Sequence, residues 1–119
     1  MAGQLSTITL TIPAGQSESD AGNFTSDMGV SKVLQHAIVM PSAWTNANLT
    51  FQISFDGIEF FDVCDFLGDP MMINVMPGSV ILVPDNFAQA AQFMKVRSGT
   101  RENPVPQEAA RVFTVFVES

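Results

Sequence analysis

The densest group of acidic side chains lies near the middle of the 119-residue chain, and the chemistry open to it is cation binding. Its members are Asp56, Asp62, Asp65 and Asp69. Calcium takes about six to eight oxygen ligands, and loop carboxylates are a common source of them. The spacing of these aspartates does not follow the D-x-D-x-D-G pattern of a calcium loop, and Asp56-Gly57 is already explained as a pair of turn residues. We therefore expect no metal and no cofactor, with calcium as the minor alternative.

Catalysis would most readily use the single histidine, His36, or the single cysteine, Cys64. General-base chemistry usually requires a histidine placed beside a nucleophile or a carboxylate. His36 falls between Leu34 and Ile38 in an alternating segment, a pattern more typical of a packed side chain. Cys64 lies in an apolar run and is expected to be a buried, inert thiol, and no motif pairs it with His36. The sequence therefore predicts that the protein is not an enzyme.

Four of the five basic residues lie close together in sequence, at Lys95, Arg97, Arg101 and Arg111. Two interpretations stay open. The group is either a solvated strand edge with local salt bridges or a contact patch for an acidic partner such as a neighbouring copy, for which arginine is well suited. The formal net charge is −7, and there is no basic stripe of the kind that binding to nucleic acid requires. We expect neither nucleic acid nor an anionic membrane as a partner.

The elements that position these residues are predicted to be strands. Leu5 to Ile12 alternates between apolar residues and threonine, and Leu49 to Phe55 alternates in the same way before Asp56-Gly57, from which Ile58 to Val63 returns as a hairpin. Further strands are predicted at 23–25, 32–40, 71–75, 79–83, 92–97 and 112–117, with single helical turns at 42–45 and 87–91. The fold class is therefore all-β: one domain, residues 1–119, forming an antiparallel, jelly-roll-like sandwich of eight or nine short strands.

The last predicted strand is apolar on both faces. Phe113, Val115 and Val117 share one face, while Val112 and Phe116 lie on the other. A solvated antiparallel sheet should carry polar residues on its outer face. Either the long loop that precedes this strand or a neighbouring subunit is expected to cover it. Only 14% of the residues are charged, which also favours a subunit of an assembly.

Nothing in the sequence directs the chain to a membrane. It contains no apolar run near the ~20 residues that span a bilayer, and the N-terminal segment lacks the basic start and apolar centre of a signal peptide. Synthesis in a host cytoplasm is expected.

Three spaced motifs resemble small β-sandwich proteins encoded among the virion genes of tailed bacteriophages. They are F-x-I-S-F-D-G-x-x-F-x-D at Phe51 to Asp62, F-M-K-V-R-S-G-T at Phe93 to Thr100, and P-V-P-Q-x-A-x-R at Pro104 to Arg111. The resemblance covers about residues 41–117. It implies a capsid decoration (cement) protein on the capsid surface that contacts the major capsid protein and copies of itself, often as a homotrimer.

The surfaces expected to make these contacts are the N-terminal strand, the 98–111 loop and the capsid-facing basic residues. The candidate residues are Lys95, Arg97, Arg101, Arg111, Phe116, Ile8, Leu10 and Trp44. The K-V-R-S-G segment also resembles strands of discoidin-like and carbohydrate-binding jelly rolls. The alternative is therefore a receptor-recognition module of a phage tail or fibre that binds glycan through Trp44, although the chain has no tyrosine and no second tryptophan.

Overall fold

The computed structural model describes residues 5–23, 35–83 and 92–118. Within these ranges it contains eight strands and no helix, so no helix there could span a membrane. The strands are β1 (Leu5–Ile12), β2 (Gly22–Asn23), β3 (Gln35–Val39), β4 (Leu49–Ser54), β5 (Phe61–Asp62), β6 (Val80–Val83), β7 (Phe93–Ser98) and β8 (Arg111–Glu118).

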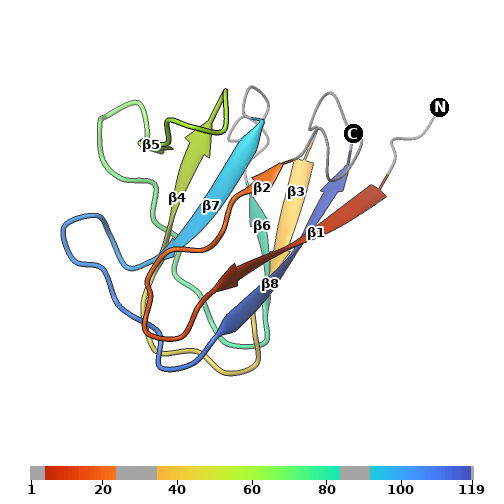
Figure 1. Cartoon of the computed structure of the whole chain (residues 1–119), viewed down its shortest axis with the longest axis vertical. Coiled ribbons are helices and arrows are strands. Elements are labelled where there is room, and N and C mark those ends of the chain that lie inside the picture. Colours follow the sequence, from red (N-terminus) through yellow and green to blue (C-terminus); the bar gives the residue numbers. More distant parts are fainter. Residues whose placement is uncertain (1–4, 24–34, 84–91, 119) are drawn as a thin grey trace.

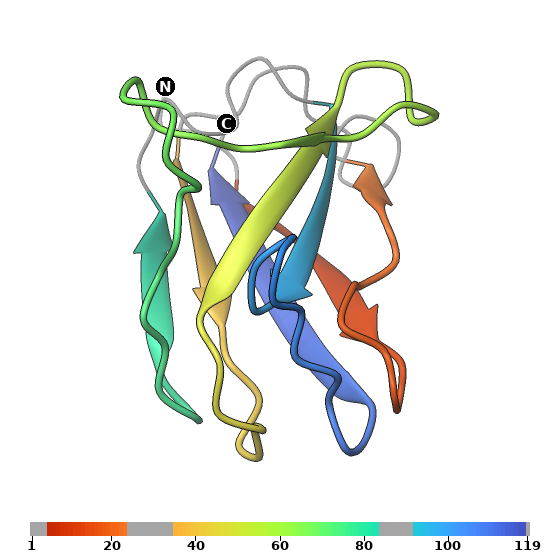
Figure 2. The same cartoon turned by 90° about the vertical axis from the view of Figure 1, so that its left-hand side faces the viewer.

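The strands form two antiparallel sheets that pack as two layers (Figure 1, Figure 2). Sheet A has the strand order β1-β8-β3-β6, and sheet B has the order β2-β7-β4-β5. The chain crosses from one sheet to the other at nearly every connection, which is the strand order of a jelly roll. The prediction of an all-β antiparallel sandwich is confirmed.

Apolar side chains that alternate along the strands fill the space between the sheets. Leu10, Ile38, Phe51, Met94 and Phe113 are fully buried there. Each such side chain contributes roughly 1.5–3 kcal/mol when it is removed from water. Because successive residues of a strand point to opposite faces, the same alternation determines which side chains reach the outer face of each sheet.

Trp44 is partly buried and packs against this core. Its ring lies edge-on to Phe113, with the ring centroids 5.6 Å apart and an interplanar angle of 80°. Its Nε1–H donates a hydrogen bond to the carbonyl of Ala47 at 3.1 Å. The helical turn predicted at 42–45 does not form.

The hairpin predicted from the segments 49–55 and 58–63 forms only in part. β4 pairs along its whole length with β7, and it pairs with β5 only through Gln52–Asp62 and Ile53–Phe61. A loop over 55–60 replaces the expected two-residue turn. Ser54 and Asp56 explain the longer loop, because their side chains accept several of its N–H groups, including that of Gly57 at 2.8 Å.

The strands predicted at 71–75 and 79–83 do not pair with each other as a hairpin, although Gly78 between them does make a turn with φ of 72°. β6 pairs with β3, not with the segment 71–75, which meets β4 only at an isolated bridge. Three apolar side chains of that segment are partly buried against the core. The alternation of apolar residues in 71–75 therefore reflects partial burial against the core, although the segment does not pair as a strand of either sheet. The strand predicted at 23–25 corresponds to β2, and the helical turn predicted at 87–91 lies outside the described residues.

Candidate functional site

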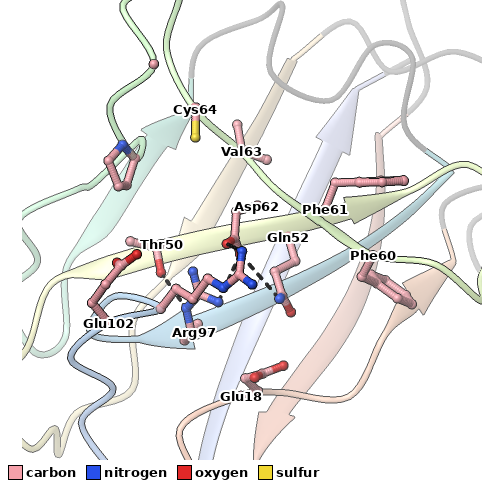
Figure 3. Close-up of a pocket in the computed structure, with 13 residues that line it drawn as sticks. Glu18, Thr50, Gln52, Phe60, Phe61, Asp62, Val63, Cys64, Arg97 and Glu102 are labelled. Atoms are coloured by element: carbon pink, nitrogen blue, oxygen red, sulfur yellow. Dashed lines mark hydrogen bonds and ion pairs between the residues drawn. The ribbon is translucent and has the colours of Figure 1, made fainter.

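A pocket of about 650 Å³ lies on the outer face of sheet B. Its floor is formed by β4 and β7, and its walls come from β5, the loop over 65–70 and the start of the loop after β7 (Figure 3). The side chains that define its chemistry are Gln52, Phe61, Asp62, Arg97, Arg101 and Glu102. A pocket of this size is in the range that holds small molecules.

An ion pair forms the centre of the pocket. Arg97 Nη1 lies 3.0 Å from Asp62 Oδ1, and the Arg97 side chain is only 5% exposed. Arg97 Nε donates to Thr50 Oγ1 at 3.0 Å, and that hydroxyl donates in turn to the carbonyl of Gly99 at 2.7 Å. Arg101, which is 76% exposed, places Nη1 3.6 Å from the second oxygen of Asp62. The buried guanidinium is therefore held in one orientation from two sides.

Gln52 lies beside this ion pair and is incompletely satisfied. Its Nε2 donates to Asp62 Oδ1 at 3.4 Å. Its Oε1 is buried and has no hydrogen-bond partner among the described residues. Across the strand pair from Gln52, Lys95 places its ammonium 4.4 Å from the centre of the Phe60 ring, within reach of a cation–π interaction.

The predicted basic group is split by the fold. Lys95, Arg97 and Arg101 lie on or beside the outer face of sheet B. Arg111 begins β8 in sheet A, where its Nε donates to Gln107 Oε1 at 3.0 Å and its Nη2 donates to a threonine hydroxyl. The interpretation as local salt bridges therefore describes Arg97 and Arg101, since both face Asp62.

Gln107 is a residue that the sequence analysis missed. It is 1% exposed and ties the loop after β7 to both sheets. Its Nε2 donates to Ser98 Oγ at 2.7 Å and to the Thr45 carbonyl at 3.0 Å, while its Oε1 accepts from the Thr45 N–H at 2.8 Å as well as from Arg111. A glutamine directly after Pro106 in a loop gives no signal of burial, because its partners are set by the fold.

Cys64 is exposed at the wall of the pocket, so the prediction of a buried thiol is wrong. The physical reason is alternation: Asp62 pairs with Gln52 on the outer side of sheet B, and Cys64, two residues further on, lies on that same side and not toward the core. His36 pairs through its backbone with Val83 and Val117, and its side chain lies outside the described atoms.

The acidic cluster has structural roles at three of its positions. Asp56 and Asp65 each accept backbone N–H groups of their own loops, and Asp62 pairs with the two arginines. In the described part of the chain, no three potential ligands come together as a metal site.

The outer face of sheet A has the opposite character. Strand register aligns ten outward positions on four strands whose side chains the structure describes, and none of these ten is charged. They are Thr7, Thr9, Thr11, Ala37, Val39, Val80, Leu82, Val112, Thr114 and Phe116. Beyond them the same rows continue at Leu5, Gln35 and Glu118, whose side chains lie outside the described atoms. Leu82 is 81% exposed, Val80 58% and Val112 51%, so the long loop before β8 does not cover this surface. We call these ten positions the uncharged face.

The apolar interface candidates fall into three environments. Phe116 belongs to the uncharged face and is half-buried. Leu10 is fully buried in the core, and its side chain is not available to a partner. Ile8 and Trp44 are partly buried against the same core.

Comparison with known proteins does not place this chain in a family. No family model matches the chain, and no curated protein matches its sequence. A solved structure with a similar arrangement is that of the Yersinia pseudotuberculosis-derived mitogen (YPM), at 13% identity, with a TM-score of 0.43 over 98% of this chain and 86% of that one.

Proposed function

We propose that the chain is a virion structural protein of the capsid-decoration kind, and that the uncharged face is its contact with neighbouring copies. The observation that carries this proposal is the absence of charge at ten aligned positions in a chain with a net charge of −7. Two copies of so acidic a protein repel each other over most of their surface. The uncharged face is where a second copy approaches at the least electrostatic cost while removing Leu82, Val80 and Val112 from water.

The size of the face favours a contact that works in an array. Four strands spaced by ~4.8 Å, with lengths from ~14 Å for β6 to ~27 Å for β1 and β8, present roughly 400 Å². A stable interface between two isolated proteins buries about 800 Å² on each partner. The contact is therefore weak by itself and becomes strong when many copies are held on a common lattice, since each further contact is then effectively intramolecular. A capsid surface, with the major capsid protein beneath, supplies such a lattice.

Sedimentation equilibrium of the purified protein tests the contact. We expect reversible self-association that rises over the micromolar to millimolar range and is abolished by Leu82→Glu combined with Val112→Glu, because two carboxylates facing their symmetry mates would repel. The control is Leu67→Glu, which changes an equally exposed leucine, 74% accessible, in a loop beside sheet B. A monomer at every concentration, or an equal loss of association with the control, would remove the proposed contact.

The place on a virion is tested separately by mass spectrometry of purified phage particles from the source of this gene. We expect the chain in many copies per particle, released when the uncharged face carries the two glutamates. Purified particles that lack the chain would refute the decoration role even if self-association were observed.

A further inference from the structure

The pocket on sheet B has a feature that a solvated strand edge does not need: donors and acceptors fixed in place. Arg97 is held by Asp62 and Thr50, and Asp62 is held by Arg97 and Arg101. Taking such an ion pair out of water is costly, and an apolar pair of similar volume is often equally stable. The buried pair therefore has little value as a stabilising device, while a fixed array of polar groups is what a binding site requires.

The charge balance of the pocket excludes simple ions as its ligand. Three carboxylates, those of Glu18, Asp62 and Glu102, line it together with the guanidiniums of Arg97 and Arg101. An anion would meet the carboxylates at close range, and the buried guanidinium is already paired with Asp62. A cation near Asp62 would meet the positive charges of the Arg97 and Arg101 guanidiniums, which already neutralise that carboxylate. A ligand suited to this lining is neutral and both donates and accepts hydrogen bonds.

We propose that this pocket binds a saccharide, with Asp62 and Arg97 contacting neighbouring hydroxyl groups and Phe60 packing against the apolar face of the sugar ring. A hydroxyl group donates one hydrogen bond and accepts others, so a pair of adjacent hydroxyls matches an acceptor beside a donor. Phe60 is partly buried and lines the pocket (Figure 3). It lies two residues before Asp62, so alternation along the chain places both side chains on the outer side of sheet B, where the Lys95 ammonium contacts the Phe60 ring.

Gln52 supplies a second, independent indication of a missing hydrogen-bond donor. Its Oε1 is a buried acceptor without a partner among the described residues, in a side chain that lines the same pocket. Buried polar atoms of this kind are uncommon, and each requires an explanation. Protein atoms now cover Gln52 Oε1. A ligand hydroxyl group that displaced them could donate a hydrogen bond to this oxygen.

This site is separate from the uncharged face, because it lies on the outer side of the other sheet. Saccharide binding is therefore independent of the decoration role: variants of the uncharged face should leave sugar binding intact, and variants of the pocket should leave self-association intact.

The test is a ¹⁵N NMR titration of the whole chain with glucose, galactose, N-acetylglucosamine and rhamnose, each to about 50 mM, a range that detects millimolar affinity. Galacturonic acid and inorganic phosphate form the anionic arm. We expect shifts with at least one neutral sugar at the Gln52 side-chain amide, the Arg97 Nε–H and the backbone of β5. Shifts with phosphate or galacturonic acid alone would overturn the assignment, as would no shift with any neutral sugar.

Matched phenylalanine variants complete the test. Phe60→Ala should weaken sugar binding about tenfold through the lost ring contact. Phe66→Ala should leave binding unchanged, because Phe66 is 97% exposed and does not line the pocket. Arg101→Ala removes an exposed guanidinium at the rim of the pocket without removing the buried ion pair, and it should weaken binding by about twofold to fivefold. Equal binding by the Phe60→Ala variant would contradict the proposal.

Discussion

The two outer faces of the sandwich are built on the same pleated backbone and have opposite chemistry. The outer side of sheet B carries Gln52, Lys95 and Arg97, and Asp62 neutralises the buried guanidinium. The ten positions of the uncharged face carry threonine and apolar side chains only. An outer face in water ordinarily mixes polar and charged groups that point freely into solvent. Neither face follows that pattern, so each is better explained by a contact than by solvation.

The two faces also differ in the free-energy cost that each one carries. On sheet B the chain bears the desolvation of an ion pair within a single molecule, and that cost is present whether or not a ligand binds. On sheet A the cost is exposed apolar surface, which only another molecule can remove. Substitutions on sheet B should therefore change the stability of the isolated protein, whereas those on the uncharged face should change its association.

The largest effect is expected at a glycine that supports sheet B. Gly99 has φ of +85°, and a Cβ there would lie 2.5 Å from the Asn103 carbonyl oxygen and 2.8 Å from the Val105 nitrogen. Its own carbonyl accepts the Thr50 hydroxyl beneath Arg97. Gly99→Ala should lower the free energy of unfolding by about 2–4 kcal/mol, because strain and a backbone clash act together. Urea denaturation measures this loss.

Gly15→Ala is the matched control for that substitution. Gly15 also has a positive φ of +78°, but a Cβ there meets nothing within 4 Å. Positive φ alone should cost about 1–2 kcal/mol. Equal losses of unfolding free energy in the two variants would show that the loop after β7 moves to accommodate the added Cβ at little cost. That result would contradict a rigid pocket.

The second effect concerns the ion pair itself. Arg97→Met should destabilise the fold by about 2–3 kcal/mol, less than for a fully buried pair, because Asp62 is 21% exposed and can regain water. Combining it with Asp62→Leu should recover much of the loss, since no charge then remains unpaired. On the uncharged face, Val112→Thr should stay within about 0.5 kcal/mol. The measurement is a double-mutant cycle of Arg97→Met and Asp62→Leu by urea denaturation. Additive losses in this cycle would contradict a stabilising ion pair between Arg97 and Asp62.

The sequence predicted the sandwich because alternation along a strand is a local signal. Leu5–Ile12 and the strand over 92–97 alternate, and both appear as β1 and β7 with the expected sides inward. The two-sided apolar character of the last strand was likewise visible, and it led to the expectation of a cover. That a neighbouring copy covers the outer side of this strand stays a prediction.

The pocket could not be predicted, because its parts are far apart in the chain. Asp62 and Arg97 meet only when β4 lies between β5 and β7, and no spacing rule relates them. The sequence grouped Arg97 with Arg111 by proximity, whereas the fold sends Arg111 to the other sheet. Cys64 was misplaced for a related reason: an apolar run does not reveal which of its sides faces the core, and the pairing of Asp62 with Gln52 puts Cys64 on the outer side.

The smallest expected effect is a response to pH that only the sheet B side should show. Asp56 lies in the loop before β5, and the N–H groups of Glu59 and Ile58 and the Ser54 hydroxyl, which all donate to its carboxylate, lower its pKa below the ordinary 3.8. A depressed pKa means that the charged form stabilises the folded loop. This contribution is present above pH 3.8 and is lost as the pH falls through the folded-state pKa.

An NMR titration should resolve this loss. The Asp56 carboxyl should titrate below 3.8, and the amide signals of Ile58 and Glu59 should move with it. Asp56→Asn keeps an acceptor oxygen, so it should hold the loop while removing the response. The amides of Thr9 and Thr114 on the uncharged face should not shift in the same window, because neither they nor the other eight positions can titrate there. Parallel shifts on both faces would instead indicate global acid unfolding and would leave the loop without a titration of its own.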